Sequence, residues 1–188
     1  MQTKRKVNRV FLLMFCYFVG LNSFAAGAST GLIQVLGPCL DDQTFAVAHL
    51  DVTRLDLDAF VDKVASVMSE HAGPDKANDI HAGLKDFRAE AGAELTGLKE
   101  AGGRDIFAVF SMYDFPYFFV AVPIPSGSDP ARLHQYVQKM AEDFDVGDVE
   151  THVTGRLILV GLERTVTRLK TVSPTPSRAL EESLQACA

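Results

Sequence analysis

The residues best suited to chemistry are four aspartates near one predicted strand, namely Asp51, Asp56, Asp58 and Asp62. Clustered carboxylates can bind a divalent cation, and a pair of them can share acid and base roles in hydrolysis. The segment lacks the glycine and the terminal glutamate of a calcium loop. Acidic residues at the start of a helix also cap free N–H groups and interact favourably with its dipole, which is the simpler interpretation.

Other catalytic and cofactor-binding patterns are missing from the sequence. The segment Ser126-Gly127-Ser128 is not a G-x-S-x-G elbow, and the five histidines form no H-E-x-x-H pair. No glycine-rich phosphate loop follows a strand. The sequence therefore predicts no catalytic residue, no cofactor and no metal ligand, and it favours a protein without enzymatic activity. A metal-dependent hydrolase that uses the cluster Asp51–Asp62 is the alternative.

Aromatic residues gather at the turn between two predicted strands. Tyr113, Phe115 and Tyr117 lie within five consecutive positions of that turn. Exposed tyrosine and phenylalanine side chains are typical anchors of protein interfaces. The same rings could instead fold back over the edge of the sheet. We expect Tyr113, Phe115 and Tyr117 to be contact residues for a partner.

Two cysteines lie near the two ends of the predicted mature chain. Cys39 and Cys187 could pair in an oxidising compartment and join the termini, whereas Cys16 belongs to the N-terminal segment. Otherwise each cysteine is a small apolar residue or a free thiol.

The first 28 residues have the layout of a secretory signal. A basic start, an apolar run over residues 10–20 and the small residues Ala26-Gly27-Ala28 follow one another. This predicts export to the periplasm or the extracellular space; an uncleaved membrane anchor is the alternative. Loss of four basic residues would change the balance of 18 basic and 24 acidic side chains to 14 and 24. Such an acidic protein is a poor partner for nucleic acid.

The rest of the chain predicts one domain over residues 29–172, followed by a flexible tail over 173–188. Apolar periodicity and turn residues predict the elements in the order β-α-α-β-β-α-β-β-α. The expected strands are 44–51, 105–112, 117–123, 149–153 and 156–161, and the expected helices are 57–72, 75–101, 130–144 and 162–172. This order contains βαββαβ, so we predict an α+β fold with a ferredoxin-like (split βαβ) antiparallel sheet. Its helices should lie on one face, with a helical hairpin inserted after the first strand.

Several predicted strands are apolar on both faces. Along residues 106–110, for example, apolar side chains occupy every position instead of every second one. Helices can cover one face, so the second face must be covered by the terminal segments, by a second subunit or by another protein. We predict self-association or partner binding through that face; intramolecular cover by the termini is the alternative.

One resemblance follows from these residues. The stretch from Asp41 to Val52, an amphipathic helix after it and the segment Gly102-Gly103-Arg104-Asp105 resemble predicted exported proteins of planctomycete-type bacteria. That family has no assigned activity, so the resemblance implies export and no site residue. Together these observations predict an exported, non-catalytic binding or assembly module. Its partner would be a second copy or an envelope protein, with membrane attachment only through an uncleaved signal.

Overall fold

The computed structural model describes residues 35–72, 74–142, 148–171 and 182, without the side chains of residues 71–79. The predicted signal over residues 1–28 lies outside this range, as does all of the tail 173–188 except residue 182. Both therefore stay predictions. Among the described helices, none combines the length and the apolar character needed to cross a membrane.

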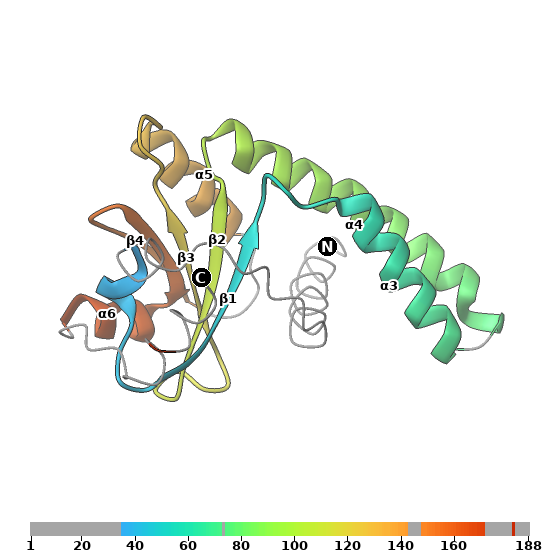
Figure 1. Ribbon diagram of the computed structural model, residues 1–188, viewed down its shortest axis with the longest axis horizontal. Coiled ribbons are helices and arrows are strands. Elements are labelled where there is room, and N and C mark those ends of the chain that lie inside the picture. The colour runs from blue at the N-terminus through green and yellow to red at the C-terminus, as the bar shows by residue number, and fades with distance from the viewer. Residues whose placement is uncertain (1–34, 73, 143–147, 172–181, 183–188) are drawn as a thin grey trace.

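The described chain has an α+β fold (Figure 1). Its elements, in order, are η1 (Gly37–Cys39), β1 (Thr44–Asp51), α3 (Leu57–Ala72), α4 (Pro74–Glu100), β2 (Asp105–Ser111), β3 (Phe119–Pro123), α5 (Pro130–Glu142), β4 (Val149–Thr154), β5 (Leu157–Leu162) and α6 (Glu163–Thr171). Every predicted strand and helix is present, in the predicted order.

Local signals explain where the helices begin and end. Asp56 and Asp129 accept hydrogen bonds from the backbone N–H groups of Ala59 and Ala131, at 2.9 and 3.0 Å, and so cap α3 and α5. At the end of α4, Gly102 has a φ of +96° and Gly103 N donates to Leu98 O at 2.8 Å. This left-handed glycine turns the chain sharply back toward β2.

All strands belong to one sheet with the order β1-β2-β3-β5-β4, and all neighbours are antiparallel. β3 and β4 therefore run parallel on either side of β5, and α5 connects them. In a ferredoxin-like sheet, the first two strands are likewise separated by another strand. Here β1 and β2 are instead direct antiparallel neighbours, so the predicted order is wrong for this half of the sheet. Two helices carry the chain out and back, which returns it beside the strand that it left.

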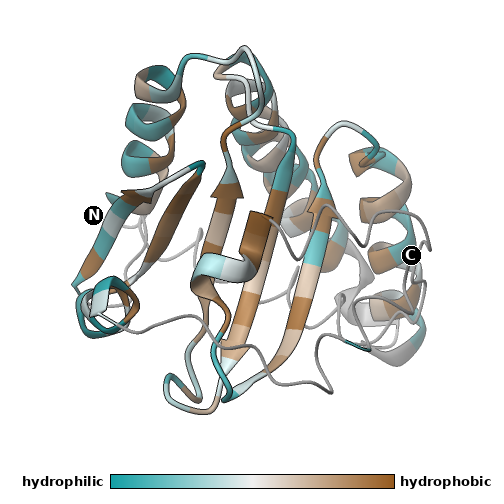
Figure 2. Ribbon diagram, turned by 60° about the vertical axis from the view of Figure 1, so that its left-hand side comes forward, coloured by the Kyte–Doolittle hydropathy of each residue, from teal (hydrophilic) through white to brown (hydrophobic). Residues whose placement is uncertain are grey.

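The prediction of helices on one face is also wrong, because both faces of the sheet are covered. On one face, α4 and α5 bury a core that includes Leu98, Leu133, Val137, Ile158 and Val160. On the opposite face, residues of β2, β3 and β5 pack against Leu169 of α6. Along the central strands, hydrophobic residues do not alternate with polar ones (Figure 2). Both faces of these strands are therefore apolar and favour burial.

The second face is covered by segments of the chain itself. Leu36, Cys39 and Leu40 are at most 1% exposed and pack with Phe107, Val109, Phe119 and Leu159. Over β2, β3 and β5 the alternative of intramolecular cover is therefore correct. This part of the sheet is therefore already covered within one chain.

The helices α3 and α4 project from the sheet and pack against each other (Figure 1). They share a small core of their own, with Val61, Ala65, Leu84, Phe87 and Ala91 buried between them. The C-terminal part of α4 contributes to the core of the sheet through Leu95 and Leu98, and Ala101 follows directly after the helix.

Candidate functional site

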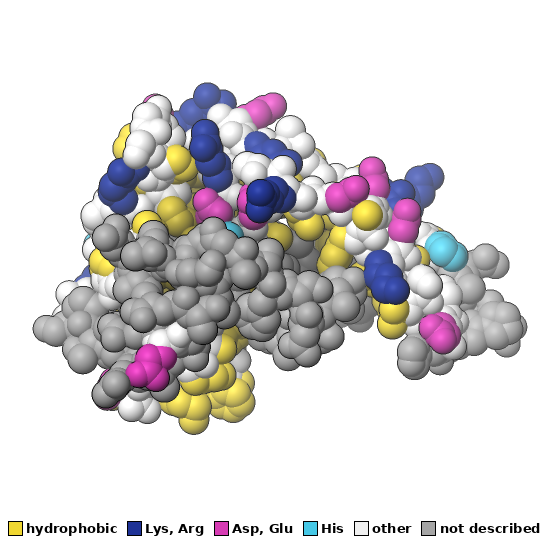
Figure 3. Space-filling view, viewed as in Figure 1, with side chains coloured by type: hydrophobic (Ala, Val, Ile, Leu, Met, Phe, Trp, Pro, Cys, Tyr) yellow, Lys and Arg dark blue, Asp and Glu magenta, His cyan; other side chains and the backbone are white. Residues whose placement is uncertain are grey.

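The turn between β2 and β3 carries four exposed, large hydrophobic side chains. Met112 and Tyr113 are each 60% exposed, Phe115 is 67% exposed and Tyr117 is 42% exposed. Figure 3 shows hydrophobic side chains gathered at the lower end of the molecule, where Figure 1 shows this turn. Phe115 therefore does not fold back over the sheet. We call residues 112–118 the aromatic loop.

Backbone bonds shape the aromatic loop into two successive turns. Asp114 N donates to Ser111 O at 3.0 Å, and Tyr117 N donates to Asp114 O at 2.8 Å. The side chain of Asp114 is only 3% exposed, although its neighbours Tyr113 and Phe115 face solvent. The loop is thus held from below by one buried carboxylate while its rings point outward.

A half-buried arginine connects that carboxylate to the rest of the fold. Arg168 of α6 donates from Nη2 to Asp114 Oδ2 at 2.6 Å and from Nη1 to Asp41 Oδ2. Burial alone would lower the pKa of Arg168, but its hydrogen bonds with Asp114 and Asp41 raise that pKa above the ordinary value. The guanidinium is therefore charged at any physiological pH and balances two buried carboxylates.

Hydroxyl groups complete this network. Thr165 Oγ1 donates to Asp114 Oδ1 at 2.8 Å, Ser111 Oγ donates to Asp41 Oδ1 at 3.1 Å, and Thr44 Oγ1 donates to Asp41 Oδ1 at 2.9 Å. The buried polar residues of the described chain, all of which belong to this network, are Asp41, Thr44, Ser111, Asp114 and Thr165. These hydrogen bonds and ion pairs connect the aromatic loop to β1, β2 and α6, so they restrict its movement.

Two arginines of α6 also lie over tyrosine rings of the aromatic loop. The guanidinium carbon of Arg168 is 5.1 Å from the ring centre of Tyr113, and that of Arg164 is 5.3 Å from the ring centre of Tyr117. These are distances at which cation–π attraction acts. Helix α6 therefore orients both tyrosines.

Sequence reasoning found the rings but missed the residues that hold and extend them. Arg164 and Arg168 are four positions apart on one helix, a spacing that places both on the same face. Phe45 is 52% exposed, and its ring lies 6.2 Å from that of Phe110. Phe45 lies near the loop because its neighbour Thr44 pairs with Ser111, at a point where the strand register shifts.

The acidic cluster has local structural partners. Asp51 accepts hydrogen bonds from Thr53 Oγ1 at 2.6 Å and from the backbone N–H groups of Thr53 and Arg54. These bonds lower the pKa of Asp51, and the bond from the Thr53 hydroxyl is the main cause. Asp58 and Asp62 both face Arg88 of α4, at 3.2 and 2.5 Å. In the described part of the chain, no three histidine, cysteine or carboxylate side chains are grouped to hold a metal ion.

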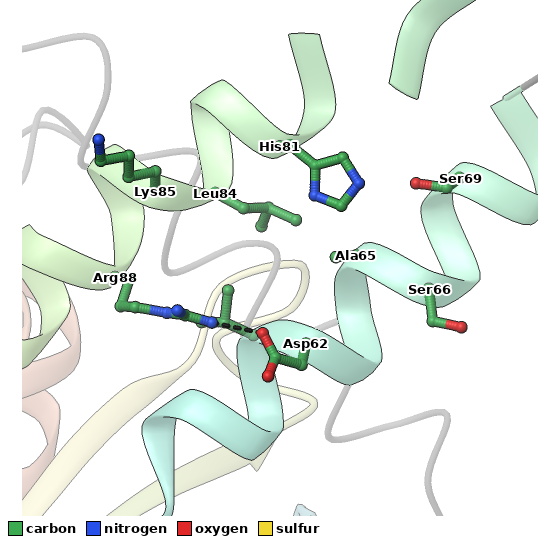
Figure 4. A pocket seen from close by; sticks show the side chains of 9 residues that line it. Asp62, Ala65, Ser66, Ser69, His81, Leu84, Lys85 and Arg88 are labelled. Carbon is green, nitrogen blue, oxygen red and sulfur yellow. Dashed lines mark hydrogen bonds and ion pairs between the residues drawn. The ribbon is translucent and has the colours of Figure 1, made fainter. Parts of the chain in front are cut away.

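A second feature is an open cleft of 560 Å³ between α3 and α4. Ser69 of α3 and His81 of α4 face each other across it, while Arg88 reaches Asp62 at its other end (Figure 4). Ser69 Oγ is buried and has no hydrogen-bond partner. Nucleophilic catalysis requires a serine that bonds an oriented base. Among the described residues, no hydrogen bond joins Ser69 Oγ to a base.

Cys39 is buried in the cover of the second face, and its Sγ donates to Leu36 O at 3.0 Å. The pKa of this thiol is raised to about 12, mainly because the thiol is buried. Its predicted partner Cys187 lies outside the described residues, so the disulfide stays a prediction. Cys39 is poorly placed for redox or nucleophilic chemistry in the folded protein.

We expect Cys39 to resist alkylation in the folded protein. A pKa near 12 instead of 9.0 lowers the thiolate fraction at pH 8 about 1,000-fold. In a chain with Cys16→Ser and Cys187→Ser, iodoacetamide labelling followed by mass spectrometry should be at least 100-fold slower without urea than in 8 M urea. Equal rates would show that the thiol is accessible. With Cys187 intact, failure to label in urea until a reductant is added would demonstrate the disulfide.

The end of the sheet thus combines exposed aromatic side chains with a rigid, charged support. This arrangement provides apolar contact area and a cationic edge, and its carboxylates are already bound. No protein-family model, curated protein or solved structure matches the chain.

Proposed function

We propose that the protein is an exported, non-catalytic binding or assembly module that docks a partner protein through the aromatic loop. One observation carries this proposal. Large apolar side chains of the aromatic loop are exposed to solvent, and Phe115 is 67% exposed. Ion pairs of Arg168 with Asp41 and Asp114 anchor this loop. Export is inferred from the layout of residues 1–28 and forms part of the proposal.

The energetics of association support this role. Interfaces concentrate their binding energy in a few aromatic and arginine side chains. Binding also costs conformational entropy, and this cost is smaller when the contact residues are already fixed. Arg168 fixes the aromatic loop from below, while Arg164 and Arg168 orient Tyr117 and Tyr113. The rings are therefore presented in a binding-competent arrangement.

We also propose a description of the fold that suits this role. The unit β3-α5-β4-β5 is a ferredoxin-like, split βαβ half, and α3 with α4 is a helical hairpin added between β1 and β2. In this description the sheet is the platform, and the aromatic loop at its end is the contact element.

A photo-crosslinking phenylalanine analogue at position 115 should capture a partner in the native cell envelope. The tagged full-length chain would be irradiated in its own cells and its adducts identified by mass spectrometry. Truncation of an interface anchor costs about 2 kcal/mol, or roughly 30-fold in affinity. Adding Tyr117→Ser to the crosslinking chain should therefore reduce the adduct at least tenfold.

The control places the same analogue at Lys139, an exposed position on α5. Circular dichroism would first confirm that both chains are folded. Equal adducts at positions 115 and 139, or no adduct at position 115, would contradict the proposal.

A further inference from the structure

We infer that the partner presents a carboxylate beside an apolar side chain, and that Arg164 receives this carboxylate while Phe115 and Tyr117 receive the apolar group. This inference rests on the proposed function and names the chemistry of the partner.

The two arginines at the aromatic loop differ in whether their guanidinium groups already have hydrogen-bond partners. Arg168 is shielded and pairs with Asp41 and Asp114. Arg164 is exposed and, among the described residues, its side chain has no ion pair or hydrogen bond. Its contact there is the ring of Tyr117, at 5.3 Å. Arg164 is therefore a cation at the site whose hydrogen-bonding capacity is unused.

The stacked position makes Arg164 a selective receptor for a carboxylate. A guanidinium presents a planar fork of N–H donors that fits the two oxygens of a carboxylate. Stacking on Tyr117 holds the fork in place, so less side-chain entropy is lost when the pair forms. An apolar group packed on Phe115 would exclude water from the pair and strengthen it.

Net charge argues for a protein segment instead of an anionic membrane. The chain carries a formal net charge of −6, which repels a surface covered with anionic headgroups. A single carboxylate on a protein segment needs only one local cation. Charge complementarity at Arg164 thus favours an acidic residue flanked by an apolar one.

The test is selection from a random peptide library displayed on phage, with the full chain immobilised. Selected sequences should be enriched in aspartate or glutamate next to an aromatic or aliphatic residue. The same selection with Arg164→Gln should lose the acidic position, and selection with Phe115→Ser should lose the binders. Arg132→Gln removes an equally exposed positive charge from α5 and should change neither result.

Fluorescence anisotropy would then measure the affinity of the protein for the best acidic peptide. It would also measure the affinity for a matched peptide in which the amide (asparagine or glutamine) replaces the acid. The acidic peptide should bind at least tenfold more tightly. This advantage should disappear with Arg164→Gln and persist with Arg132→Gln.

The outcomes separate the two proposals. Neutral peptides that depend on Phe115 would overturn the carboxylate inference and leave the proposed function standing. A library without any binder that depends on Phe115 would count against both. Binding of the full chain to phosphatidylglycerol vesicles that Arg164→Gln abolishes would overturn the inference by assigning Arg164 to a lipid phosphate.

Discussion

Replacing Arg168 with methionine should lower the free energy of unfolding by about 3–5 kcal/mol. The substitution keeps much of the apolar stem but leaves Asp41 and Asp114, each 2–3% exposed, as buried carboxylates without their cation. Hydroxyl groups would still donate to both carboxylates, but no positive charge would offset the cost of removing them from water. Urea unfolding followed by circular dichroism would measure the loss, which corresponds to a decrease in Tm of roughly 10 °C.

The matched control is Lys170→Met on the same helix. Lys170 pairs with Glu150 at 2.6 Å, but both side chains are about one-third exposed. An exposed pair of this kind contributes less than about 1 kcal/mol. Equal effects of Arg168→Met and Lys170→Met would contradict a special role of the buried network. Combining Arg168→Met with Asp41→Asn and Asp114→Asn should recover part of the lost stability, because no unpaired charge then remains.

The consequence for function follows from the position of the network. Asp114 is the one buried residue of the aromatic loop, and Arg168 pairs with its side chain. Loss of this bond should release the turn and increase amide hydrogen exchange at residues 112–118 more than in β3. Binding that depends on Phe115 would weaken without any change in the rings themselves.

The aromatic loop shows what a sequence can and cannot predict about a site. Tyr113, Phe115 and Tyr117 were identifiable because they interrupt two apolar strands at a turn, which is a local signal. The residues that hold the loop were not identifiable from the sequence, because Arg168 and Asp41 are separated by 127 positions. A contact of that sequence separation depends on the tertiary arrangement, and single residues such as Asp41 carry no pattern that indicates it.

The fold was predictable to a similar depth. Periodicity places strands and helices well, because each element buries its own face. Strand order is different, since the same apolar pattern satisfies both a ferredoxin-like order and the observed neighbours β1 and β2. The sequence also required cover for the second face, yet Leu36 and Leu40 lie in a short segment without periodicity. Which alternative covers the face is decided by packing.

Truncating the leucine side chains that cover the second face should also lower the free energy of unfolding substantially. Leu36 and Leu40 are 0% and 1% exposed, and each contributes to the core on the second face. A leucine-to-alanine change at such a position costs about 2–5 kcal/mol, because it removes apolar contact and leaves a cavity. We therefore expect Leu36→Ala and Leu40→Ala each to shift urea unfolding to lower concentration. Val35→Ala, at a position 36% exposed in the same segment, should change stability by less than about 0.5 kcal/mol.

These variants also test why the second face is closed. If Leu36 and Leu40 shield Val109 and Phe119 from water, their truncation should expose an apolar sheet face and promote association. Sedimentation of the single variants should then show a mass that rises with concentration, beyond any association of the native chain, and the Val35→Ala chain should match the native one. Variants as stable as the native chain and without added association would mean that the cover is dispensable. The second face would then return as a docking surface beside the aromatic loop.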